Sequence, residues 1–403
     1  MIDFEQAYRI VEASCTKLGA EKKNISDTLG FVLAENIRAK ESIPLFDSSA
    51  VDGFAVRWED VQRVPCELSV IGTMQAGDRK KLSLRKGCAI KILTGAAVPP
   101  SATAIVMKEH VDNLGETIIV HRIAKQGEHI RRRGEEFSNG DMALKKGTHI
   151  NPPVVGLLAT LGYPNVSVYR KPKVSLILTG NELRSPSAKL RPGQIRDSNS
   201  YALCAALAAL GIQPQFVSNV RDDQALITDA IRDALQASDI VITVGGVSVG
   251  DYDFVKEAFE RLRVQTKFWR IAIKPGKPVY FGVRGKKLVF GLPGNPVAAL
   301  LSFHLLVRMA IGKLMGRPAE DDFVIEATLG KEMKKKAGRM EFVRATLTKR
   351  ANGNFTAIPT TGQESHMMGG FASAQGLIRF PKESVLMKKG TVVHVEMINW
   401  SHV

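Results

Sequence analysis

Cysteine and histidine are too sparse, and too irregularly spaced, to define a disulfide framework or a zinc site. The 403-residue chain has four cysteines, at positions 15, 66, 88 and 204, and no two of them form a CxxC pair. Closely spaced cysteine pairs are the usual sign of such sites. The eight histidines form no HxxxH or HExxH pattern either. The sequence therefore predicts no disulfide scaffold and no histidine-based metal chemistry.

Long apolar runs are also missing. A membrane-spanning helix needs roughly 20 predominantly apolar residues, and no run in the sequence approaches that length. The first residues, MIDFEQAYRI, are acidic and lack the basic and apolar regions of a signal peptide. Hydrophobic residues make up 44% of the chain, an ordinary share for a globular protein. We therefore expect a cytoplasmic protein with no membrane partner.

Acidic residues are outnumbered, and aromatic residues are scarce. Asp and Glu total 40 against 56 Lys and Arg, which gives a formal net charge of +16, and aromatic residues are 6% of the chain. A strongly basic protein favours anionic partners. The charge alone fits nucleic acid and a small, multiply charged anion equally well. Because the basic residues are spread along the chain and no nucleic-acid-binding motif occurs, we expect no nucleic acid.

The chain is too long for one hydrophobic core, and its pattern changes twice. A chain of this length usually forms two to four domains. Short strand-like runs separated by Gly and Pro extend to about residue 150, whereas apolar strands alternate with helices between Val174 and Met315. Such alternation predicts parallel strands with helices on both faces. From about Arg317 the β character returns. The predicted fold is a multidomain α/β protein, with a central doubly wound parallel-sheet domain flanked by β-rich domains and a C-terminal β-barrel-like domain.

A glycine-rich stretch, DIVITVGGVSVGDYD, is the clearest candidate for a ligand site. Its first half is an apolar, β-branched run typical of a buried parallel strand. The glycines that follow, Gly245, Gly246 and Gly250, precede a segment with helical spacing that starts at Phe254. A strand, a glycine loop and a helix N-terminus together favour phosphate binding.

The same loop carries two carboxylates, Asp251 and Asp253. They would repel a phosphate unless a divalent cation lay between them, which favours oxygen-ligated Mg²⁺. The alternative, equally open from this stretch alone, is that the glycines make a tight turn and the aspartates cap the helix. Two other strands end in glycine-bearing loops, at 179–182 and 291–296. Because ligands bind outside the carboxyl ends of parallel strands, the three loops are expected to line one crevice.

Two common nucleotide motifs do not fit, and one lysine pair stands out. GLPGNP is not closed by Gly-Lys-Ser or Gly-Lys-Thr, and GGVSVG does not match GxGxxG, so P-loop ATP hydrolysis and nicotinamide chemistry lose support. In IAIKPGKP, Lys274 and Lys277 flank a Pro-Gly turn, which favours anion binding over solvated surface lysines. Glu182 fits a metal ligand and an acid at a helix N-terminus equally well.

Two acidic segments in the first half have ordinary structural explanations. FDSSAVDGFAVR carries two aspartates and two serines within six residues, which is typical of an Asx-rich turn. In RRRGEEF, Glu135 and Glu136 are expected to pair with the arginines 131–133 that precede them. From spacing alone, neither segment indicates a catalytic site.

Ten segments, in order along nearly the whole chain, carry a resemblance to a known family. They are FDSSAVDGFAVR, ILTGAAVPPSATAIVMKE, RRRGEEF, LTGNEL, GQIRDSNSYAL, TVGGVSVGDYD, FWRIAIKPGKP, GLPGNPVAA, GRMEFVR and SHMMGGFASAQGLI. Together they resemble the molybdopterin molybdenumtransferase family, the MoeA family, which includes the corresponding domain of gephyrin. Several of the segments are long, so chance is a poor explanation.

The resemblance implies a homodimer of four-domain subunits and a specific reaction. The expected domains are an elongated N-terminal and dimerisation domain at 1–45 plus 141–168, a small β-rich domain at 46–140, a molybdopterin-binding α/β domain at 169–318 and a C-terminal β-barrel-like domain at 319–403. The implied reaction inserts molybdate into adenylated molybdopterin, with Mg²⁺-dependent release of AMP, and gives the molybdenum cofactor. Molybdopterin adenylyltransferase and apo-molybdoenzymes are the further partners it implies.

The family's functional residues carry over to positions in this chain. The catalytic positions fall on Asp52, Thr94, Glu136, Glu182, Asp222 and Asp253, and Glu182, Asp222 and Asp253 are the expected Mg²⁺ ligands. The cofactor-binding positions fall on Gly245, Gly246, Ser248, Gly250, Arg270, Lys274, Lys277, Pro293, Pro296, Arg344 and Ser365. The family commonly has Asp at two positions where this chain differs. These are Glu136, which keeps the charge on a longer arm, and Asn181, which keeps an oxygen but loses the charge.

Two spatial arrangements are expected from the same resemblance. Asp52 and Thr94 are expected to act on the crevice of the partner subunit. Molybdate is expected between the central and C-terminal domains, held by Lys274, Lys277, Arg344 and Ser365, with no acid in the cluster. The alternative for this last group is that Arg344 pairs with Glu341 on the surface and Ser365 caps a turn.

Two other functions remain open at this point. A molybdopterin adenylyltransferase shares the central fold, but it needs only that domain, whereas here the β-rich segments on both sides carry matching motifs. A molybdopterin-binding scaffold or storage protein would keep the fold without turnover. The acids of the family are in place except at Asn181, which favours an active enzyme.

Overall fold

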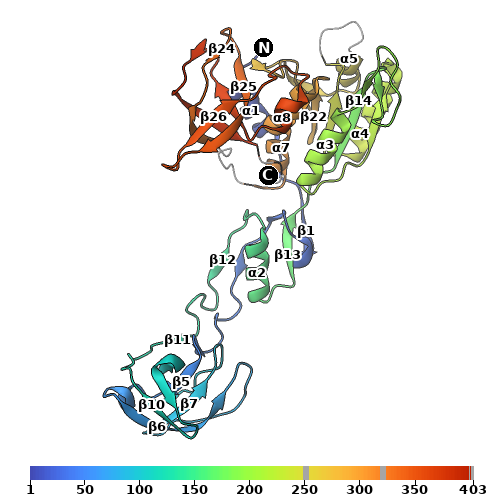
Figure 1. The fold of residues 1–403 in the computed structure, drawn as a ribbon. Helices are drawn as coiled ribbons and strands as arrows, with labels where there is room; N and C mark the ends of the chain where they lie inside the picture. Colours follow the sequence, from blue (N-terminus) through green and yellow to red (C-terminus); the bar gives the residue numbers. More distant parts are fainter. Residues whose placement is uncertain (248–253, 318–323, 399, 401–403) are drawn as a thin grey trace. The chain divides into compact units, whose positions relative to one another are not determined.

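The computed structural model describes residues 1–247, 254–317, 324–398 and 400. The chain forms two compact units, each made of segments that are separated in the sequence. Unit 1 comprises Met1–Ala34, Gly147–Asn151 and Ser167–Val403, and unit 2 comprises Glu35–Lys146 and Pro152–Val166. Figure 1 labels the elements of both units. The predicted division into four domains is finer than this and stays a prediction.

Unit 2 is built on a six-stranded sheet in the order β8-β5-β7-β6-β10-β9. Strand β5 (Gly53–Val56) is buried along its whole length, because Phe54 and Val56 pack in one apolar cluster and Ala55, pointing the other way, packs in a second. The remaining strands are β6 (Cys66–Met74), β7 (Cys88–Ile92), β8 (Ala104–Met107), β9 (Val111–Asn113) and β10 (Thr117–Val120). The predicted β-rich character of this region is confirmed.

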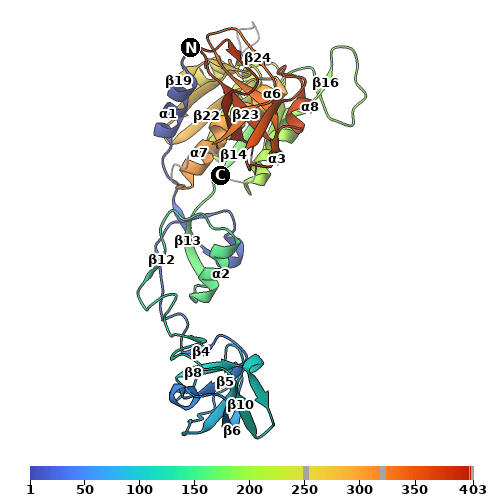
Figure 2. The ribbon, with the colours of Figure 1, turned by 60° about the vertical axis from the view of Figure 1, so that its left-hand side comes forward.

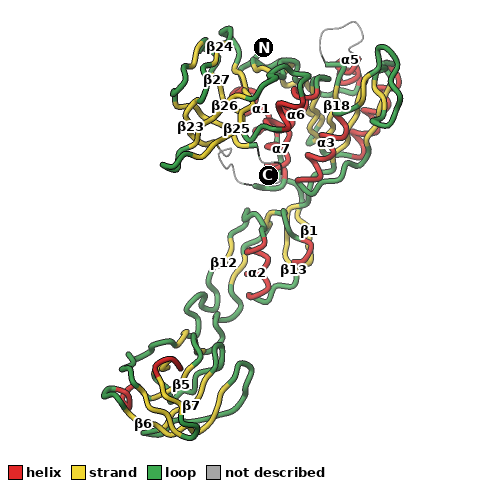
Figure 3. Tube along the Cα trace, viewed as in Figure 1, coloured by secondary structure: helices red, strands yellow, loops and turns green. Residues whose placement is uncertain are grey.

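Short elements complete unit 2, and loops connect them over much of their length (Figure 3). Two small antiparallel pairs join distant parts of the chain: β3 with β12, and β4 with β11. The Tyr163 hydroxyl donates to the Arg38 carbonyl at 2.9 Å, which ties the end of the unit's last segment to its first. The bounds are β3 (Ile37–Arg38), β4 (Ser48–Ser49), β11 (Ile130–Arg131), β12 (Met142–Leu144) and α2 (Pro152–Thr160).

The main sheet of unit 1 has the order β17-β14-β18-β22-β21-β19. The four predicted strands, β14 (Val174–Thr179), β17 (Val217–Val220), β18 (Ile240–Val244) and β22 (Lys287–Leu292), are parallel to their neighbours. Two further strands, β21 (Tyr280–Arg284) and β19 (Gln265–Trp269), are antiparallel. The predicted parallel sheet is confirmed, and these two strands, which were not predicted, extend it at one edge. Strand β21 is antiparallel because a tight connection through Gly285 turns it directly into β22 as a hairpin.

Helices cover both faces of this sheet, as predicted. Along β14, Leu176 and Leu178 pack with helix α3 (Asn199–Ala209), whereas Ile177 packs on the opposite face with α4 (Gln224–Ala237) and α5 (Phe254–Arg261). Strands buried on two faces need apolar residues at every position, which explains their unbroken hydrophobic runs. Two short strands, β15 (Leu183–Arg184) and β16 (Ile195–Arg196), pair with each other, and the loop between them extends away from the sheet (Figure 2).

One long helix follows β22 and runs through the core of unit 1. It consists of α6 (Pro296–Ser302), a π-helical turn at Phe303–Val307 and α7 (Arg308–Leu314). Its 19 residues are long and apolar enough to cross a membrane, which corrects the expectation that no run approaches that length. However, 83% of its most apolar window is buried within the protein, so the hydrophobicity is explained by packing.

The C-terminal part of unit 1 is a closed β-barrel, as predicted. The strand order is β25-β26-β23-β29-β27, and pairing of β25 with β27 closes the ring. Strand β20 (Ile273–Lys274) pairs with β25 and so joins the barrel to the chain that leaves the main sheet. The bounds are β23 (Val324–Leu329), β24 (Met333–Lys334), β25 (Met340–Lys349), β26 (Phe355–Pro359), α8 (Met368–Ala372), β27 (Gly376–Phe380), β28 (Leu386–Met387) and β29 (Val392–Met397).

The first helix, α1 (Phe4–Ser14), forms where its apolar stripe predicts it. The Asp3 carboxylate accepts from the Gln6 backbone N–H at 2.9 Å and caps the helix. Its buried face, Phe4, Ala7 and Val11, packs in the same core as α7 and β14. A three-stranded sheet follows, in the order β1-β13-β2, with bounds β1 (Ala20–Asn24), β2 (Val32–Leu33) and β13 (Asn165–Tyr169).

Candidate active site

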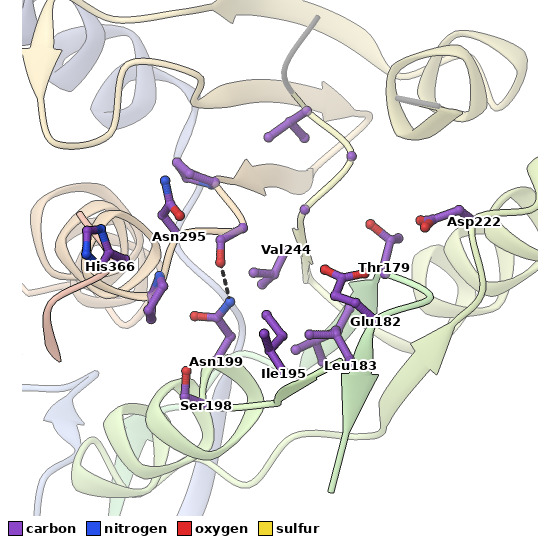
Figure 4. A pocket seen from close by; sticks show the side chains of 18 of the residues that line it. Thr179, Glu182, Leu183, Ile195, Ser198, Asn199, Asp222, Val244, Asn295 and His366 are labelled. Carbon is purple, nitrogen blue, oxygen red and sulfur yellow. Dashed lines mark hydrogen bonds between the residues drawn. The ribbon is translucent and has the colours of Figure 1, made fainter. Parts of the chain in front are cut away.

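A cavity of about 690 Å³ opens in unit 1 at the carboxyl ends of β14, β18 and β22, where the crevice was predicted. Figure 4 shows Thr179, Glu182 and Asp222 on one side of it and Asn199, Asn295 and His366 on the other. Six predicted site residues line it: Glu182, Asp222, Gly245, Gly246, Pro293 and Pro296. Three others, Ser248, Gly250 and Asp253, lie outside the described residues, as does Asp251.

The glycine turn after β18 brings backbone close to the cavity. Gly245 and Gly246 both have positive φ, 88° and 63°, a conformation that other residues adopt at a cost. A Cβ on Gly245 would lie 2.9 Å from the Thr179 carbonyl oxygen, so no side chain fits there. The turn is anchored on two sides, because Gly245 N–H donates to Leu292 O at 3.1 Å and the Trp269 indole N–H donates to Val247 O at 2.9 Å.

The acidic wall of the cavity is fixed by a reciprocal pair of hydrogen bonds. The Asn181 N–H donates to the Asp222 carboxylate at 3.1 Å, and the Asp222 N–H donates to the Asn181 side-chain oxygen at 3.3 Å. The next residue, Asp223, accepts from the N–H groups of Ala225 and Leu226 and caps α4. Asp223 therefore caps the helix, whereas its neighbour Asp222 lines the cavity.

Glu182 and Asp222 supply the donor chemistry that Mg²⁺ requires. Both are carboxylates, the hard oxygen ligands that this ion prefers. In the part of the chain that the structure describes, no group of three or more His, Cys, Asp or Glu residues gathers closely enough to form a complete metal site. The third predicted ligand, Asp253, is in the glycine loop outside that part. The two carboxylates fit the expected cation as part of its ligand set.

The opposite wall presents two helix N-termini. Ser198 and Asn199 at the start of α3, and Asn295 and Pro296 at the start of the long helix, all line the cavity. The N-terminus of α3 is capped by Asp197, whose carboxylate accepts from the Ser200 N–H at 3.0 Å. At the start of the long helix, the Val297 N–H donates to the Ser365 carbonyl at 3.1 Å. What this wall offers an anion is therefore the positive end of two helix dipoles.

A second cavity, of about 340 Å³, lies between β20 and the barrel. Lys274 and Lys334 line it with Lys331, and Thr360 and Gln363 add uncharged polar groups. The expectation that no acid belongs here was wrong, because Glu341 lines the same cavity and its carboxylate lies 3.5 Å from the Lys274 ammonium. The pair forms because β20 and β25 are in register at these two residues.

Arg344 lies on β25 and is buried. The N–H groups of its guanidinium donate mostly to backbone carbonyl groups. It is 1% exposed, and its guanidinium donates to the carbonyls of Gly362, Glu364 and Met367 and to the Gln363 side chain. Burial lowers the pKa of Arg344, and the charge of Glu364 opposes that shift. The alternative pairing with Glu341 is not what forms, since Glu341 pairs with Lys274.

The other residues expected to bind molybdate do not lie together in one cavity. Ser365 does not line the first cavity, but its hydroxyl accepts from the amide of the lining residue Asn295 at 3.0 Å. Lys277 is exposed in the turn between the two cavities. Arg270 adopts a positive φ of 76°, and its guanidinium lies 4.4 Å from the centre of the Trp269 ring. The four residues Lys274, Lys277, Arg344 and Ser365 therefore do not line a single described cavity.

Two predicted catalytic residues come together in unit 2. The Asp52 carboxylate accepts from both the backbone N–H and the hydroxyl of Thr94, at 2.9 and 2.8 Å. These two hydrogen bonds lower the pKa of Asp52 below its usual value, and the bond from the Thr94 N–H has the larger effect. The nearby charge of Lys108 lowers the pKa by a smaller amount. Glu136 is exposed in a neighbouring loop.

The arginines near Glu136 pair differently from expectation. Arg132 binds the carboxylate of Asp47 at 2.6 Å, and Glu135 accepts from the Arg132 backbone N–H at 2.7 Å. Asp47 also accepts from the Arg133 N–H at 2.8 Å, which fixes the loop by backbone contacts more than by arginine side chains.

Several lining residues were not predicted. They are uncharged or weakly charged residues at strand and helix ends: Thr179, Ser198, Asn199, Asn295 and His366. Each falls within a segment that carried the family resemblance, so the segments contained the signal. The individual positions did not stand out, because neutral side chains become site residues only through the fold.

Known proteins resemble the chain over nearly its whole length. Successive segments match the families described as MoeA N-terminal region (domain I and II) at 2–162, probable molybdopterin binding domain at 175–313 and MoeA C-terminal region (domain IV) at 326–398. The molybdopterin molybdenumtransferase of Staphylococcus epidermidis is 37% identical over 378 residues, which cover 92% of this chain and 90% of that protein. The one from Haemophilus influenzae is 36% identical over 383 residues, 94% of each.

A solved structure agrees with the sequence matches. The molybdopterin biosynthesis MoeA protein of Pyrococcus horikoshii aligns with a TM-score of 0.82 at 30% identity, covering 99% of this chain and 100% of that one. The fold is a multidomain α/β architecture with a cavity at the carboxyl edge of a largely parallel sheet, the usual place for a ligand in such sheets. The chain belongs to the molybdopterin molybdenumtransferase, or MoeA, family, whose members are transferases of molybdenum cofactor biosynthesis.

Proposed function

We propose that the protein inserts molybdate into adenylated molybdopterin and releases AMP, with Mg²⁺ as the required cation. The observation that carries this proposal is the two-sided cavity, in which Glu182 and Asp222 face the N-termini of α3 and the long helix. One wall suits a divalent cation and the other suits phosphate oxygens. A substrate that contains a phosphoanhydride needs both walls.

The acidic wall is the proposed reaction centre. Glu182 and Asp222, with Asp253, would hold Mg²⁺, which would supply positive charge to neutralise the phosphate groups of the substrate. Asn181 keeps Asp222 in place through its two hydrogen bonds. The Gly245–Gly246 turn lets the phosphate groups approach the backbone, because no Cβ fills that space. Pro293 and Pro296 line the opposite wall beside the helix N-terminus.

The second cavity is the proposed entry site for molybdate. A tetrahedral dianion needs charged and hydroxyl donors, which Lys274, Lys331 and Thr360 supply there. The Lys274–Glu341 pair must open for Lys274 to bind the dianion. Arg344 supports this wall from behind, since it holds the loop that carries Gln363 and Ser365.

Two further parts of the proposal are the oligomeric state of the protein and its location in the cell. The protein is proposed to act as a homodimer in the cytoplasm, with Asp52, Thr94 and Glu136 completing the crevice of the partner subunit. Molybdopterin adenylyltransferase is the proposed supplier of its substrate and apo-molybdoenzymes the proposed recipients of its product. The Asp52–Thr94 contact supports a shared role for these two residues.

The test measures AMP release and cofactor formation by purified protein given adenylated molybdopterin, Mg²⁺ and molybdate. Wild type is expected to release AMP, and Glu182→Ala to do so roughly 100-fold more slowly or worse, because several kcal/mol of charge stabilisation is lost. Glu326→Ala is the matched control, since Glu326 is an exposed glutamate on the barrel. Tight binding without AMP release by wild type would instead identify a scaffold or storage protein.

A further inference from the structure

The hydroxyl of Thr179 is buried in the wall of the first cavity without a partner. Thr179 is the last residue of β14 and is 7% exposed, yet its Oγ1 makes no hydrogen bond to any residue that the structure describes. It lines the cavity beside Glu182 and Asp222 (Figure 4). A buried hydroxyl without a hydrogen bond is costly, so native proteins usually provide a partner. The partner expected here is a group that enters the cavity.

Other buried hydroxyls of the same sheet do have protein partners. Ser175, on the same strand and the same face, lies 2.6 Å from the Ser238 hydroxyl. Thr243, on the neighbouring strand β18, donates to the Phe290 carbonyl at 3.5 Å. The hydroxyl without a partner, that of Thr179, therefore lies where the sheet meets the cavity. The hydroxyls of Ser175 and Thr243 have hydrogen-bond partners within the protein.

Packing alone does not require a hydroxyl at this position. Side chains alternate along β14, so Thr179 points to the same face as Ile177, where Val247 and Val255 complete an apolar cluster. Valine has the same shape as threonine and would suit these neighbours. The hydroxyl of Thr179 consequently needs an explanation other than the core.

The glycine turn lies directly against this hydroxyl. A Cβ on Gly245 would lie 2.9 Å from Thr179 Oγ1, and a Cβ on Gly246 would lie 3.1 Å from it. Either contact is closer than a side chain normally tolerates, so a residue other than glycine would crowd Oγ1. The pair of glycines thus keeps any side chain away from Oγ1, and only backbone separates it from the rest of the turn.

We propose that the Thr179 hydroxyl donates a hydrogen bond to a phosphate oxygen of the ligand held in this cavity. This rests on the proposed function, which places the phosphoanhydride against the acidic wall. Ionised Glu182 and Asp222 can only accept hydrogen bonds, so they cannot bind a phosphate oxygen without the cation between them. Thr179 adds an uncharged donor to that wall, which orients the phosphate without adding charge to the metal site.

The test compares Thr179→Val, which removes the hydroxyl at constant shape, with Thr179→Ser, which keeps it. Binding of adenylated molybdopterin is titrated calorimetrically, and the phosphorus resonances of the bound ligand are recorded by ³¹P NMR. Thr179→Val is expected to weaken binding by about tenfold or more, since a hydrogen bond to a charged acceptor is lost, and to shift one phosphorus resonance. Thr179→Ser is expected to stay close to wild type. Thr243→Val, the control, removes a buried hydroxyl that already has a protein partner.

The outcomes separate this inference from the proposed function. Wild-type affinity and an unchanged phosphorus spectrum in Thr179→Val would overturn the inference while leaving the function intact. Equal loss in Thr179→Val and Thr179→Ser would overturn it too, because the hydroxyl would not be the group that matters. A wild-type protein that binds no adenylated molybdopterin would overturn both. Mn²⁺ titration followed by electron paramagnetic resonance is expected to be the same in wild type and Thr179→Val, and weaker Mn²⁺ binding would instead make Thr179 a metal ligand.

Discussion

At the scale of single residues, Asn181 supports Asp222 through two hydrogen bonds. Its side-chain oxygen accepts from the Asp222 N–H, and its own N–H donates to the Asp222 carboxylate. An amide performs the accepting part as well as a carboxylate does. Asn181 therefore makes both hydrogen bonds to Asp222 without a charge of its own.

We predict opposite effects for two substitutions at this residue. Asn181→Ala removes the acceptor for the Asp222 N–H and is expected to weaken Mg²⁺ binding by roughly fivefold, the worth of about 1 kcal/mol. Asn181→Asp keeps the acceptor and adds a carboxylate, so it is expected to bind Mg²⁺ more tightly than wild type. Calorimetric Mg²⁺ titrations of the three proteins decide this. Tighter binding by Asn181→Ala would exclude the supporting role.

The residues that the sequence identified are those whose chemistry is visible without a fold. Glu182 carries a charge and Gly245 a special backbone freedom, and both line the cavity as predicted. Thr179 and Asn295 were missed because their importance depends on where a strand or helix ends. Arg344 was identified as a cation, but only the fold reveals that four groups of one loop surround its guanidinium.

At the scale of elements, a buried charge cluster joins the long helix to the barrel. His304 in the π-helical turn lies 3.2 Å from Glu396 on β29, and Arg379 on β27 lies 3.1 Å from the same carboxylate. Glu396 is 1% exposed. Burial raises the pKa of Glu396, but His304 and Arg379 together lower it further, so the net pKa is below the ordinary value. The carboxylate is therefore retained in its charged form.

This cluster predicts how stability depends on pH. A lowered carboxylate pKa in the folded state gives a stabilisation that is present above the ordinary value of 4.5 and is lost as the pH falls through the folded-state pKa. Glu396→Gln is expected to lose about 3–5 kcal/mol of stability near neutral pH, because the Arg379 guanidinium loses its buried counter-charge. The difference from wild type should narrow below about pH 4.5. Thermal unfolding midpoints between about pH 2 and 8 provide the measurement, with exposed Glu326→Gln as the control.

A constant difference between Glu396→Gln and wild type across that pH range would contradict the role of the charge. It would indicate that the substitution acts through packing alone. Glu326→Gln is expected to change little, because exposed ion pairs contribute at most about 1 kcal/mol.

Elements were predictable from sequence where burial is uniform. The runs of β14 and β18 are apolar at nearly every position, since helices cover both faces. Strand β19, QTKFW, has three exposed residues and one fully buried residue, and it lies at the edge of the sheet. An edge strand with so little buried surface has no clear hydrophobic pattern, so the sequence alone does not predict β19. Its pairing with β21 depends on the hairpin that β21 forms with β22.

At the scale of the whole molecule, a crevice shared between subunits predicts complementation. Asp52→Ala and Glu182→Ala proteins, each inactive, are mixed under conditions of subunit exchange. If Asp52 acts on the partner's crevice, each mixed dimer has one intact site, and about a quarter of wild-type activity is expected from random pairing. AMP release is the readout.

The control for this experiment mixes Glu182→Ala with Asp222→Ala, two residues of the same crevice. Every site in those mixed dimers carries one defect, so no activity should return. Failure of the Asp52 mixture to recover, with subunit exchange demonstrated by mass spectrometry, would place Asp52 in its own subunit's site or outside the reaction.

The discontinuous make-up of the two units has a consequence for synthesis. Unit 2 is complete at residue 166, whereas unit 1 begins with the first 34 residues and needs the chain from 167 onward to supply its main sheet and barrel. Because the chain emerges from the ribosome N-terminus first, unit 2 can fold while most of unit 1 is still unmade. Helix α1 must wait for α7, some 300 residues later, before its apolar face is covered. During translation that face is exposed, and it is the part of the nascent chain on which a chaperone is expected to act.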